Sequence, residues 1–587
     1  MDTVLDLPPP NKKRRIPKAC AACHRSKLKC DERRPCTRCV QSGTTCVWHE
    51  KTQDPVAERF ERVEHAIRAL NERIDVRDTP IAASTGSTLD RPQDTAVEHT
   101  AVDETSTTIC GMFSVRQPAI RDVIASGVVL ESDAQTWFAF FMAGCDRFVP
   151  VFDPKRDTFH SVRRRSTVLF DVLITVGCMA ASGSLSKAFL SLYQVVKQHT
   201  SDLTLHDSGH CLESVQALLV IASYSDSCAT ILDTAVRASL RLRLPETVTL
   251  VYTSIAQGTD AGSRTEKCSA EQYASTRTWH GLVLLDQILS LDGGKARSVT
   301  VAVPRRVRAL LSHPHCSMLD LRLFAQVELN ELRASCHAAV AASANGGEQV
   351  LHQTINGCLL DLSMWHSEWE ALINRNVSGD VENTVFVVNL RIQHAWAVLT
   401  LQLRALAASG VENLAVMTDT QRALAFSAKL AAERHLELLL TSTPAAPSPG
   451  APEEHTICLR PYASNFRFAM EFVWAKNVFC VLIVLRLAIL LGDPVSTLSR
   501  RLQQTQDFLD ELKKVGKGAN MHYTQILSQI AEKCQRAVEG SVEASADLLQ
   551  ESSIPHEFLL GWNFPGLNLC YLPLDWQDLF LDFDPLD

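Results

Sequence analysis

The chain has 587 residues, of which 46% are hydrophobic and 21% are charged, and its net charge is −8. This length is sufficient for a large buried core. The opening residues MDTVLDLPPP contain no apolar segment of the kind that directs secretion, which argues against a secreted protein built on a disulfide framework.

Residues 1–16 are expected to form a disordered, basic N-terminus. They contain the run KKRR at Lys12–Arg15. Such runs suit nuclear localisation signals, although many are simply solvated charge. We therefore expect the protein to act in the nucleus.

The next segment is defined by its cysteines. Six lie within 27 residues, in the repeated spacing C-x2-C-x6-C, x5, C-x2-C-x6-C: Cys20, Cys23, Cys30, Cys36, Cys39 and Cys46. Structural zinc is bound by four tetrahedral ligands. One zinc would leave two thiols unused, and two zincs need eight ligand positions, which six sulfurs supply if two of them bridge both metals. The spacing therefore predicts a metal-binding domain over residues 17–48, with two zinc ions per chain.

This stretch, KACAACHRSKLKCDERRPCTRCVQSGTTC, resembles the fungal binuclear zinc cluster transcription factors, the family of the yeast galactose regulator. The resemblance implies that Cys20 and Cys36 bridge the two zincs. Cys23 and Cys30 would complete one site, and Cys39 and Cys46 the other. It also implies that the helix after Cys23 enters the DNA major groove, where Lys27 reads a CGG-type half-site.

The charges of this segment independently favour nucleic acid. From Lys12 to Arg38 there are eleven cations and only two acids, although the whole chain is acidic. A basic patch on an acidic protein is typical of a nucleic-acid reader. Besides Lys27, the candidate DNA contacts are Lys18, Arg25 and Lys29.

A helix with a heptad pattern is expected over residues 54–76. Its apolar residues recur at alternating spacings of four and three: Val56, Phe60, Val63, Ile67, Leu70 and Ile74. Such a seam favours a short coiled coil and a homodimer. The alternative is an amphipathic helix that packs on the later domain.

Residues 77–117 are rich in Ser, Thr, Asp and Pro and are expected to be a disordered linker. Residues 118–546 then show helical rhythm and predict a large all-helical regulatory domain. In CLESVQALLVIASY, for example, Val215, Leu218, Leu219 and Ala222 fall on one helical face. The fold class predicted for the chain is therefore mostly α.

Two segments of this body stand out. The stretch VFCVLIVLRLAILLG from Val478 is strongly apolar, but Lys476 and Arg486 and its short length favour a buried helix over a membrane span. The prolines of Thr441–Glu454 predict an exposed insertion between helices. The body also resembles the middle homology region of the same fungal family, in FFMAGCDRFVPVFDP, CLESVQALLVIASY and RTWHGLVLLDQILSLDGGKARSV.

No catalytic motif is recognised, so an enzyme is not predicted. Gly293-Gly294-Lys295 suggests a phosphate loop, but Leu289 and Ala296 replace residues that such a loop requires. The cysteines outside the cluster, such as Cys178, Cys228 and Cys480, are dispersed in apolar surroundings and are expected to be buried, reduced and inert.

Residues 556–587 are expected to form an acidic and hydrophobic tail. Aspartates alternate there with Leu, Phe and Trp576, as in disordered activation segments that bind coactivators. Docking of the tail on the body is the alternative.

The chain is thus predicted to be a dimeric, DNA-binding transcriptional activator. The alternative is a ligand-sensing or interaction protein of the same family that represses or does not read DNA directly.

Overall fold

The computed structural model describes Arg33, Cys36–Gly43 and residues 121–205, 210–225, 227–257, 269–299, 304–376, 380–410, 417–444, 459–516 and 521–543. The chain divides into two units, Met1–Phe113 and Ser114–Asp587. Four predicted segments lie outside the described residues: the basic N-terminus (1–16), the coiled coil (54–76), the linker (77–117) and the acidic tail (556–587).

In the first unit, the described residues contain one short helix, α2 (Thr37–Gln41). In the second unit they are almost entirely helical. The first helices of this unit are α4 (Glu131–Gly144), α5 (Phe159–Arg165), α6 (Thr167–Ser182), α7 (Lys187–Leu205), α8 (Leu212–Ser223), α9 (Cys228–Arg241), α10 (Leu244–Gln257) and α11 (Ala270–Leu291).

The later helices are α12 (Met318–Ser343), α13 (Glu348–Asn376), α14 (Asp380–Ala408), α15 (Asp419–Leu439), α16 (Glu471–Leu490), α17 (Val495–Val515) and α18 (Met521–Glu543). Short 3-10 helices are η1 (Cys145–Arg147), η2 (Pro304–Ser312) and η3 (Tyr462–Phe468). The predicted mostly helical fold is confirmed.

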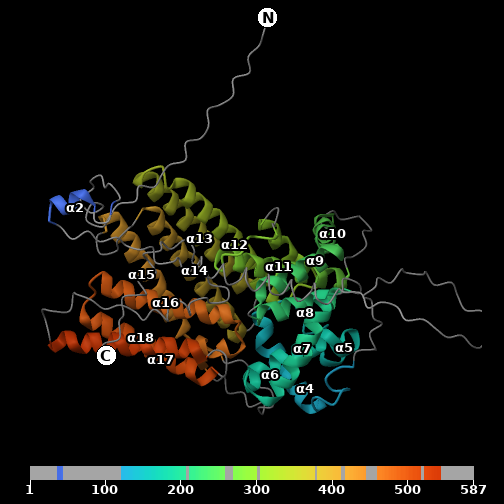
Figure 1. The fold of residues 1–587 in the computed structure, drawn as a ribbon. Coiled ribbons are helices and arrows are strands. Elements are labelled where there is room, and N and C mark those ends of the chain that lie inside the picture. The colour runs from blue at the N-terminus through green and yellow to red at the C-terminus, as the bar shows by residue number, and fades with distance from the viewer. Residues whose placement is uncertain are drawn as a thin grey trace, which may run out of the picture. The chain divides into compact units, whose positions relative to one another are not determined.

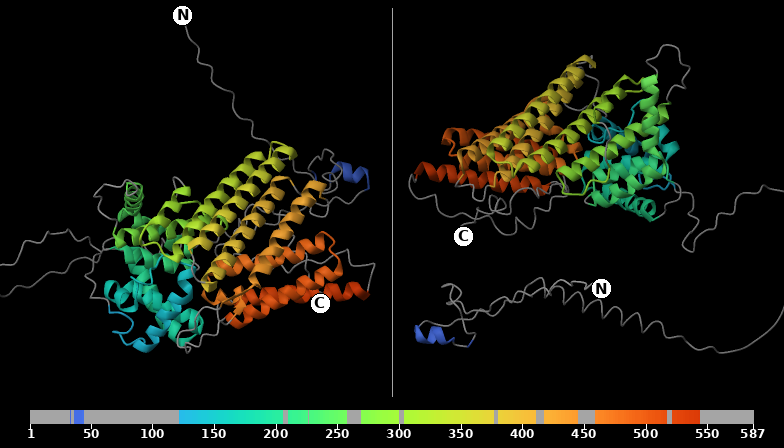
Figure 2. Two further views of the ribbon diagram at one scale, coloured as in Figure 1. Left: turned by 180° about the vertical axis from the view of Figure 1, so that it is seen from behind. Right: turned by 90° about the horizontal axis from the view of Figure 1, so that it is seen from above.

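Helices of the second unit pack mainly on their neighbours in the chain. α4 contacts α6, α13 contacts α14, and α14 contacts α15, which in turn contacts α16. Figure 1 shows α4–α10 gathered at one end of this unit and α13–α18 at the other, with α11 and α12 between them. The long helices α13–α16 lie side by side also when the unit is seen from behind and from above (Figure 2).

Two strands are present among the described residues. β1 (Ser442–Pro444) pairs antiparallel with β2 (Leu459–Pro461), so that Thr443 lies opposite Arg460. Thr443 is fully buried, because β1 also packs against α14. The prediction of an exposed insertion from Thr441 holds for Thr441 and Ser442 but is wrong for Thr443 and Pro444, which are buried. Residues 445–458 lie outside the described part.

Three helices are buried on all sides rather than on one face. On α8, every residue from Ser214 to Ser223 is buried. The predicted apolar face of Val215, Leu218, Leu219 and Ala222 is therefore only part of the buried surface of this helix. The same holds for much of α6 and α16. Helices that are hydrophobic all round belong in the centre of a large core.

The apolar helix α16 behaves as the sequence predicts. α16 and Thr384–Ala408 of α14 are long and apolar enough to cross a membrane, but 78% and 72% of their apolar windows are buried within the described body. Burial in the protein core accounts for their apolar composition. The interpretation of the Val478 stretch as a buried helix is confirmed.

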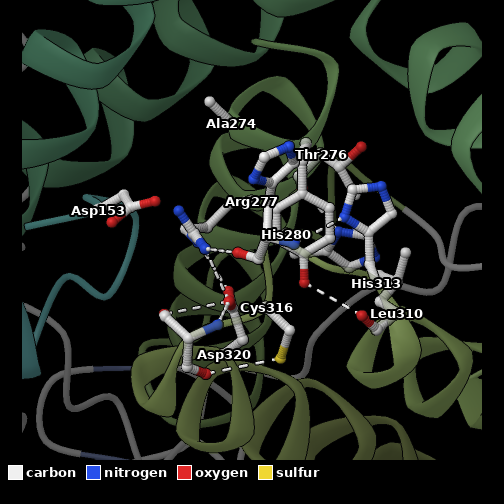
Figure 3. A network of polar contacts seen from close by, with 12 residues as sticks. Asp153, Ala274, Thr276, Arg277, His280, Leu310, His313, Cys316 and Asp320 are labelled. Atoms are coloured by element: carbon white, nitrogen blue, oxygen red, sulfur yellow. Dashed lines mark hydrogen bonds and ion pairs between the residues drawn. The ribbon is translucent and has the colours of Figure 1, made fainter. Parts of the chain in front are cut away.

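A buried ion pair joins α11 to α12 (Figure 3). Arg277 is 2% exposed, and its Nε and Nη2 each donate to the carboxylate of Asp320 at 2.7 Å. Arg277 Nη2 also donates to the carbonyl of His315, and the guanidinium lies 5.1 Å from the ring centroid of Tyr273. The backbone N–H of Ser317 donates to Asp320 at the start of α12. Every partner needed to compensate for burial of the two charges is therefore in place.

The Gly293-Gly294-Lys295 segment is a helix end and not a phosphate loop. Gly294 has φ +67°, and the N–H of Lys295 returns to the carbonyl of Leu289 at 3.1 Å. This is how a glycine in the left-handed region closes a helix C-terminus. Lys295 Nζ is bound by the carboxylates of Asp233 and Asp286 at 2.9 and 3.1 Å, so its charge is already matched within the protein.

We expect Asp320→Ala to lower the free energy of unfolding by about 3–5 kcal/mol, because it leaves the Arg277 guanidinium buried without its carboxylate. Denaturant unfolding of the whole chain measures this. The control is Glu246→Ala, whose side chain is 55% exposed and whose loss should change stability by less than about 0.5 kcal/mol. A cost for Asp320→Ala no larger than that of the control would show that the pair contributes little.

Candidate functional site

The described part of the cysteine segment is centred on α2. Cys36 is the N-cap of this helix, with extended backbone (φ −71°, ψ 147°), and Cys39 is the third residue of its first turn. The backbone N–H of Cys39 donates to Cys36 Sγ at 3.4 Å. Residues three apart lie on one side of a helix. The C-x2-C spacing therefore brings both sulfur-bearing residues to the same side of α2.

The two cysteines differ from their neighbours in solvent exposure. Cys36 and Cys39 are 0% and 3% exposed, although α2 is only five residues long. Thr37, Arg38 and Val40 between and beside them are exposed. The turn thus directs sulfur inward and its cation outward, as a metal site with an outer basic surface requires.

The chain leaves α2 by a glycine turn. The N–H of Ser42 donates to the carbonyl of Arg38 at 2.9 Å, and Gly43 follows with φ +62°. A side chain is disfavoured in this left-handed conformation, so glycine ends the helix after little more than one turn. Gly43 stands three residues before Cys46 in the chain, whose position lies outside the described residues.

The chemistry of these residues fits zinc. Thiolate is the form of cysteine that binds metal, and a backbone N–H directed at sulfur from the start of a helix favours it. Cys36 accepts such a bond, and the exposed Arg33 and Arg38 place cations in the same segment. The other predicted ligands, Cys20, Cys23, Cys30 and Cys46, lie outside the described residues, as do the predicted DNA contacts Lys18, Arg25, Lys27 and Lys29 and the heptad residues Val56, Phe60, Val63, Ile67, Leu70 and Ile74.

Burial affects the thiols of three cysteines in the body. Burial raises the pKa of the Cys178 thiol to about 11 and that of Cys228 to about 12, and it raises the pKa of Cys480 as well. Cys178 and Cys480 are buried, as predicted, whereas Cys228 is only half-buried. Thiols held in their neutral form are poor metal ligands.

A second polar site, which the sequence did not reveal, lies in the body. Arg322, Arg333, Lys476 and Asp292 line one cavity between helices α11, α12, α14 and α16. Lys476, a cation within an apolar helix, is the one feature of the sequence that could have indicated this site. The other residues come together only through packing.

Comparison with known proteins identifies the cysteine segment. Residues 18–55 match the family described as the fungal Zn(2)-Cys(6) binuclear cluster domain. The chain is 38% identical over 48 residues to the transcription factor TOG1 of Saccharomyces cerevisiae, which is 8% of this chain and 6% of that protein. It is 35% identical over 57 residues to the zinc cluster transcription factor acuM of Aspergillus fumigatus, which is 10% of this chain and 9% of that protein.

These matches cover under a tenth of the relatives' own length, and the helical body is not part of the matched domain. No solved structure matches the chain. The predicted cofactor is confirmed, since the Zn(2)-Cys(6) binuclear cluster domain binds two zinc ions.

If Cys36 bridges both metals, as the resemblance implies, its loss should remove more zinc than the loss of a terminal ligand. We expect elemental analysis to find about two zincs in the native chain. Cys39→Ala should retain clearly more zinc than Cys36→Ala, which should retain the least, because structural zinc and folding are coupled. Cys211→Ala, which removes an exposed thiol of the body, is the control and should retain two. Equal zinc contents in Cys36→Ala and Cys39→Ala would refute the bridging assignment.

Proposed function

We propose that this chain, which carries a fungal Zn(2)-Cys(6) binuclear cluster domain at residues 18–55, is a sequence-specific DNA-binding transcription factor. The observation that carries the proposal is the cysteine cluster within a basic segment. Relatives that match this segment are named as transcription factors. Zinc supplies the fold of the reading head, and the surrounding cations supply attraction to phosphate.

The arrangement of α2 supports a division of labour between sulfur and charge. Cys36 and Cys39 are buried, while Arg33 and Arg38 are exposed on the same short segment. Six thiolates and two zinc ions together carry about two negative charges, so part of the eleven cations from Lys12 to Arg38 offsets the cluster. The remainder is available to contact the DNA backbone.

Base reading is assigned to Lys27, which stands three residues before the third cysteine. In the major groove, Lys donates to O6 and N7 of guanine, and this suits a CGG-type half-site. Lys18, Arg25 and Lys29 are assigned to phosphate, where they position the domain without reading sequence.

Pairing of two chains is assigned to the heptad helix of residues 54–76. A dimer presents two zinc cluster domains. When one of them binds its half-site, the other is held at a high effective concentration near the second half-site. The matched domain extends to residue 55 and so overlaps the first two residues of this predicted segment.

The remaining segments complete the proposal. The helical body of residues 118–546 would regulate, and we assign it to the middle homology region that its sequence resembles. The tail of residues 556–587 would bind coactivators, which makes the protein an activator of RNA polymerase II genes. The KKRR run would direct it to the nucleus.

Lys27→Ala tests base reading. We expect it to weaken binding to the cognate CGG site by about 1–3 kcal/mol and to relax preference at the contacted bases. Fluorescence anisotropy with the cognate site and single-base variants measures both effects.

Arg25→Ala and Lys29→Ala are the matched controls. Loss of a phosphate contact should weaken binding to all sequences alike and reduce the salt slope by about one unit. Unchanged sequence preference in Lys27→Ala would remove this residue from the reading role.

Ile67→Asp combined with Leu70→Lys tests pairing, because it places charge in the apolar seam. We expect the double variant to be monomeric in analytical ultracentrifugation. Its binding to a probe with two half-sites should fall far more than its binding to one half-site. Equal losses on the two probes would show that this helix packs elsewhere.

A further inference from the structure

A cavity of about 50 Å³ lies inside the helical body. It is bounded by the end of α11, by α12 and α14, by η3 and by the first turns of α16. Most of its lining residues are buried, and the half-buried ones are Phe148, Ile288, Gln326, Gln393, Phe472 and Val473. This volume has room for about four water molecules or one small molecule.

The charges around the cavity are unbalanced. Arg322, Arg333 and Lys476 line it as cations, and Asp292 is the single carboxylate among the lining residues. Asp292 is already engaged, because Arg333 Nη2 donates to it at 2.6 Å and Trp396 Nε1 at 3.2 Å. All four charged side chains are at most 7% exposed. Arg322 and Lys476 therefore form no ion pair with a carboxylate among the described residues, although Asp146 acts favourably on Arg322 and Asp292 on Lys476 from a longer distance.

Lys476 and Arg322 are held by weaker partners. Lys476 Nζ donates to Gln393 Oε1 at 3.0 Å and lies 4.9 Å from the ring centroid of Trp396. The Arg322 guanidinium lies 5.2 Å from the ring centroid of Phe148 and forms no ion pair with another described residue. Burial lowers the pKa of Arg322, and it lowers that of Lys476 to about 7, which reflects the electrostatic cost of these unmatched charges.

Several guanidinium nitrogens in this region have no acceptor. Nε of Arg322 and Nε of Arg333 are buried without a hydrogen-bond partner. An adjoining cavity of about 10 Å³ shares Phe148, Arg322 and Tyr462 with the first and adds Arg147, whose Nη1 also lacks a partner. Buried polar groups in proteins are normally satisfied, and unsatisfied donors around a cavity indicate a missing acceptor.

The other buried ion pairs of the body show the contrast. Arg277 has Asp320, and Lys429 Nζ lies 2.5 Å from Asp493. Arg501 Nη2 lies 2.6 Å from Glu433. Each of these three buried cations thus has a carboxylate within ion-pair distance, whereas Arg322 and Lys476 have none among the described residues.

We propose that this cavity binds a small organic acid, whose carboxylate is held by Arg322 and Lys476. The walls include Leu284, Ile288, Ile392 and Val473, which suit a short carbon skeleton better than a fully hydrated inorganic anion. The bound acid joins α12 to α16 and so stabilises the body at its centre. This site is independent of whether the zinc cluster reads DNA.

The test is thermal unfolding of the whole chain at constant pH and ionic strength, with acetate, pyruvate, malonate, succinate or inorganic phosphate. We expect at least one of the organic acids to raise the Tm of the native chain by several degrees, since a ligand that binds only the folded state stabilises it. Titration calorimetry then gives the Kd of that acid.

Arg322→Gln and Lys476→Met should bind this acid at least tenfold more weakly. Without ligand, each should unfold at the same or a higher temperature than the native chain, because an unmatched buried charge is removed. A cation with a purely structural role would instead lower the Tm when it is replaced. Arg237→Gln, at an exposed position of α9, is the matched control and should leave both Tm and Kd unchanged.

Should Arg322→Gln fail to fold, Arg322→Lys preserves the charge and should bind the acid with intermediate affinity. The proposal is overturned if no organic acid raises the Tm, or if Arg322→Gln or Arg322→Lys binds it as tightly as the native chain. Stabilisation by phosphate alone would identify an inorganic anion site and would likewise overturn it.

Discussion

The zinc cluster domain depends on holding sulfur in a buried position, because its own side chains cannot form a core. The 27 residues from Cys20 to Cys46 contain few large apolar residues, chiefly Leu28 and Val40, and Val40 is 63% exposed. Segments below about 40 residues usually need metals or disulfides to fold. Bound zinc meets this need, and burial of Cys36 and Cys39 at the start of α2 suits it. Charge can then stay on the outside, as the proposed DNA binding requires.

The helical body, in contrast, has a large apolar core of its own and must accommodate buried polar groups. Its core is large, with α6, α8 and α16 buried on all sides, so that polar groups must be matched inside it. Arg277 with Asp320, and Lys295 with Asp286, show matching within the protein. Arg322 and Lys476 are exceptions. Buried cations without an ion pair, beside a cavity, are candidates for a functional role, and a small acid bound at this place would supply the carboxylate that they lack.

Much of the fold could be predicted where local sequence decides it, and the failures lie where tertiary packing decides. The charge of Lys476 and Arg486 correctly marked α16 as a protein helix, and Leu289 and Ala296 correctly excluded a phosphate loop. The sequence does not predict burial of α8 on every side or burial of Thr443 in β1, because both depend on tertiary neighbours. The cysteine spacing predicted the metal, since spacing sets the ligands. The cavity could not be predicted, because Asp292, Arg322 and Lys476 meet only in the packed structure.

Selection of bound sequences from a random DNA pool by the full chain tests most directly whether the zinc cluster reads DNA. The zinc-loaded chain should enrich CGG half-sites, in pairs at fixed spacing if the chain is dimeric. Removal of zinc by a chelator should abolish this enrichment, because the reading head cannot fold without its metal. Recovery of no preferred sequence by the zinc-loaded chain would contradict the proposed function, as would an enrichment that survives complete loss of zinc.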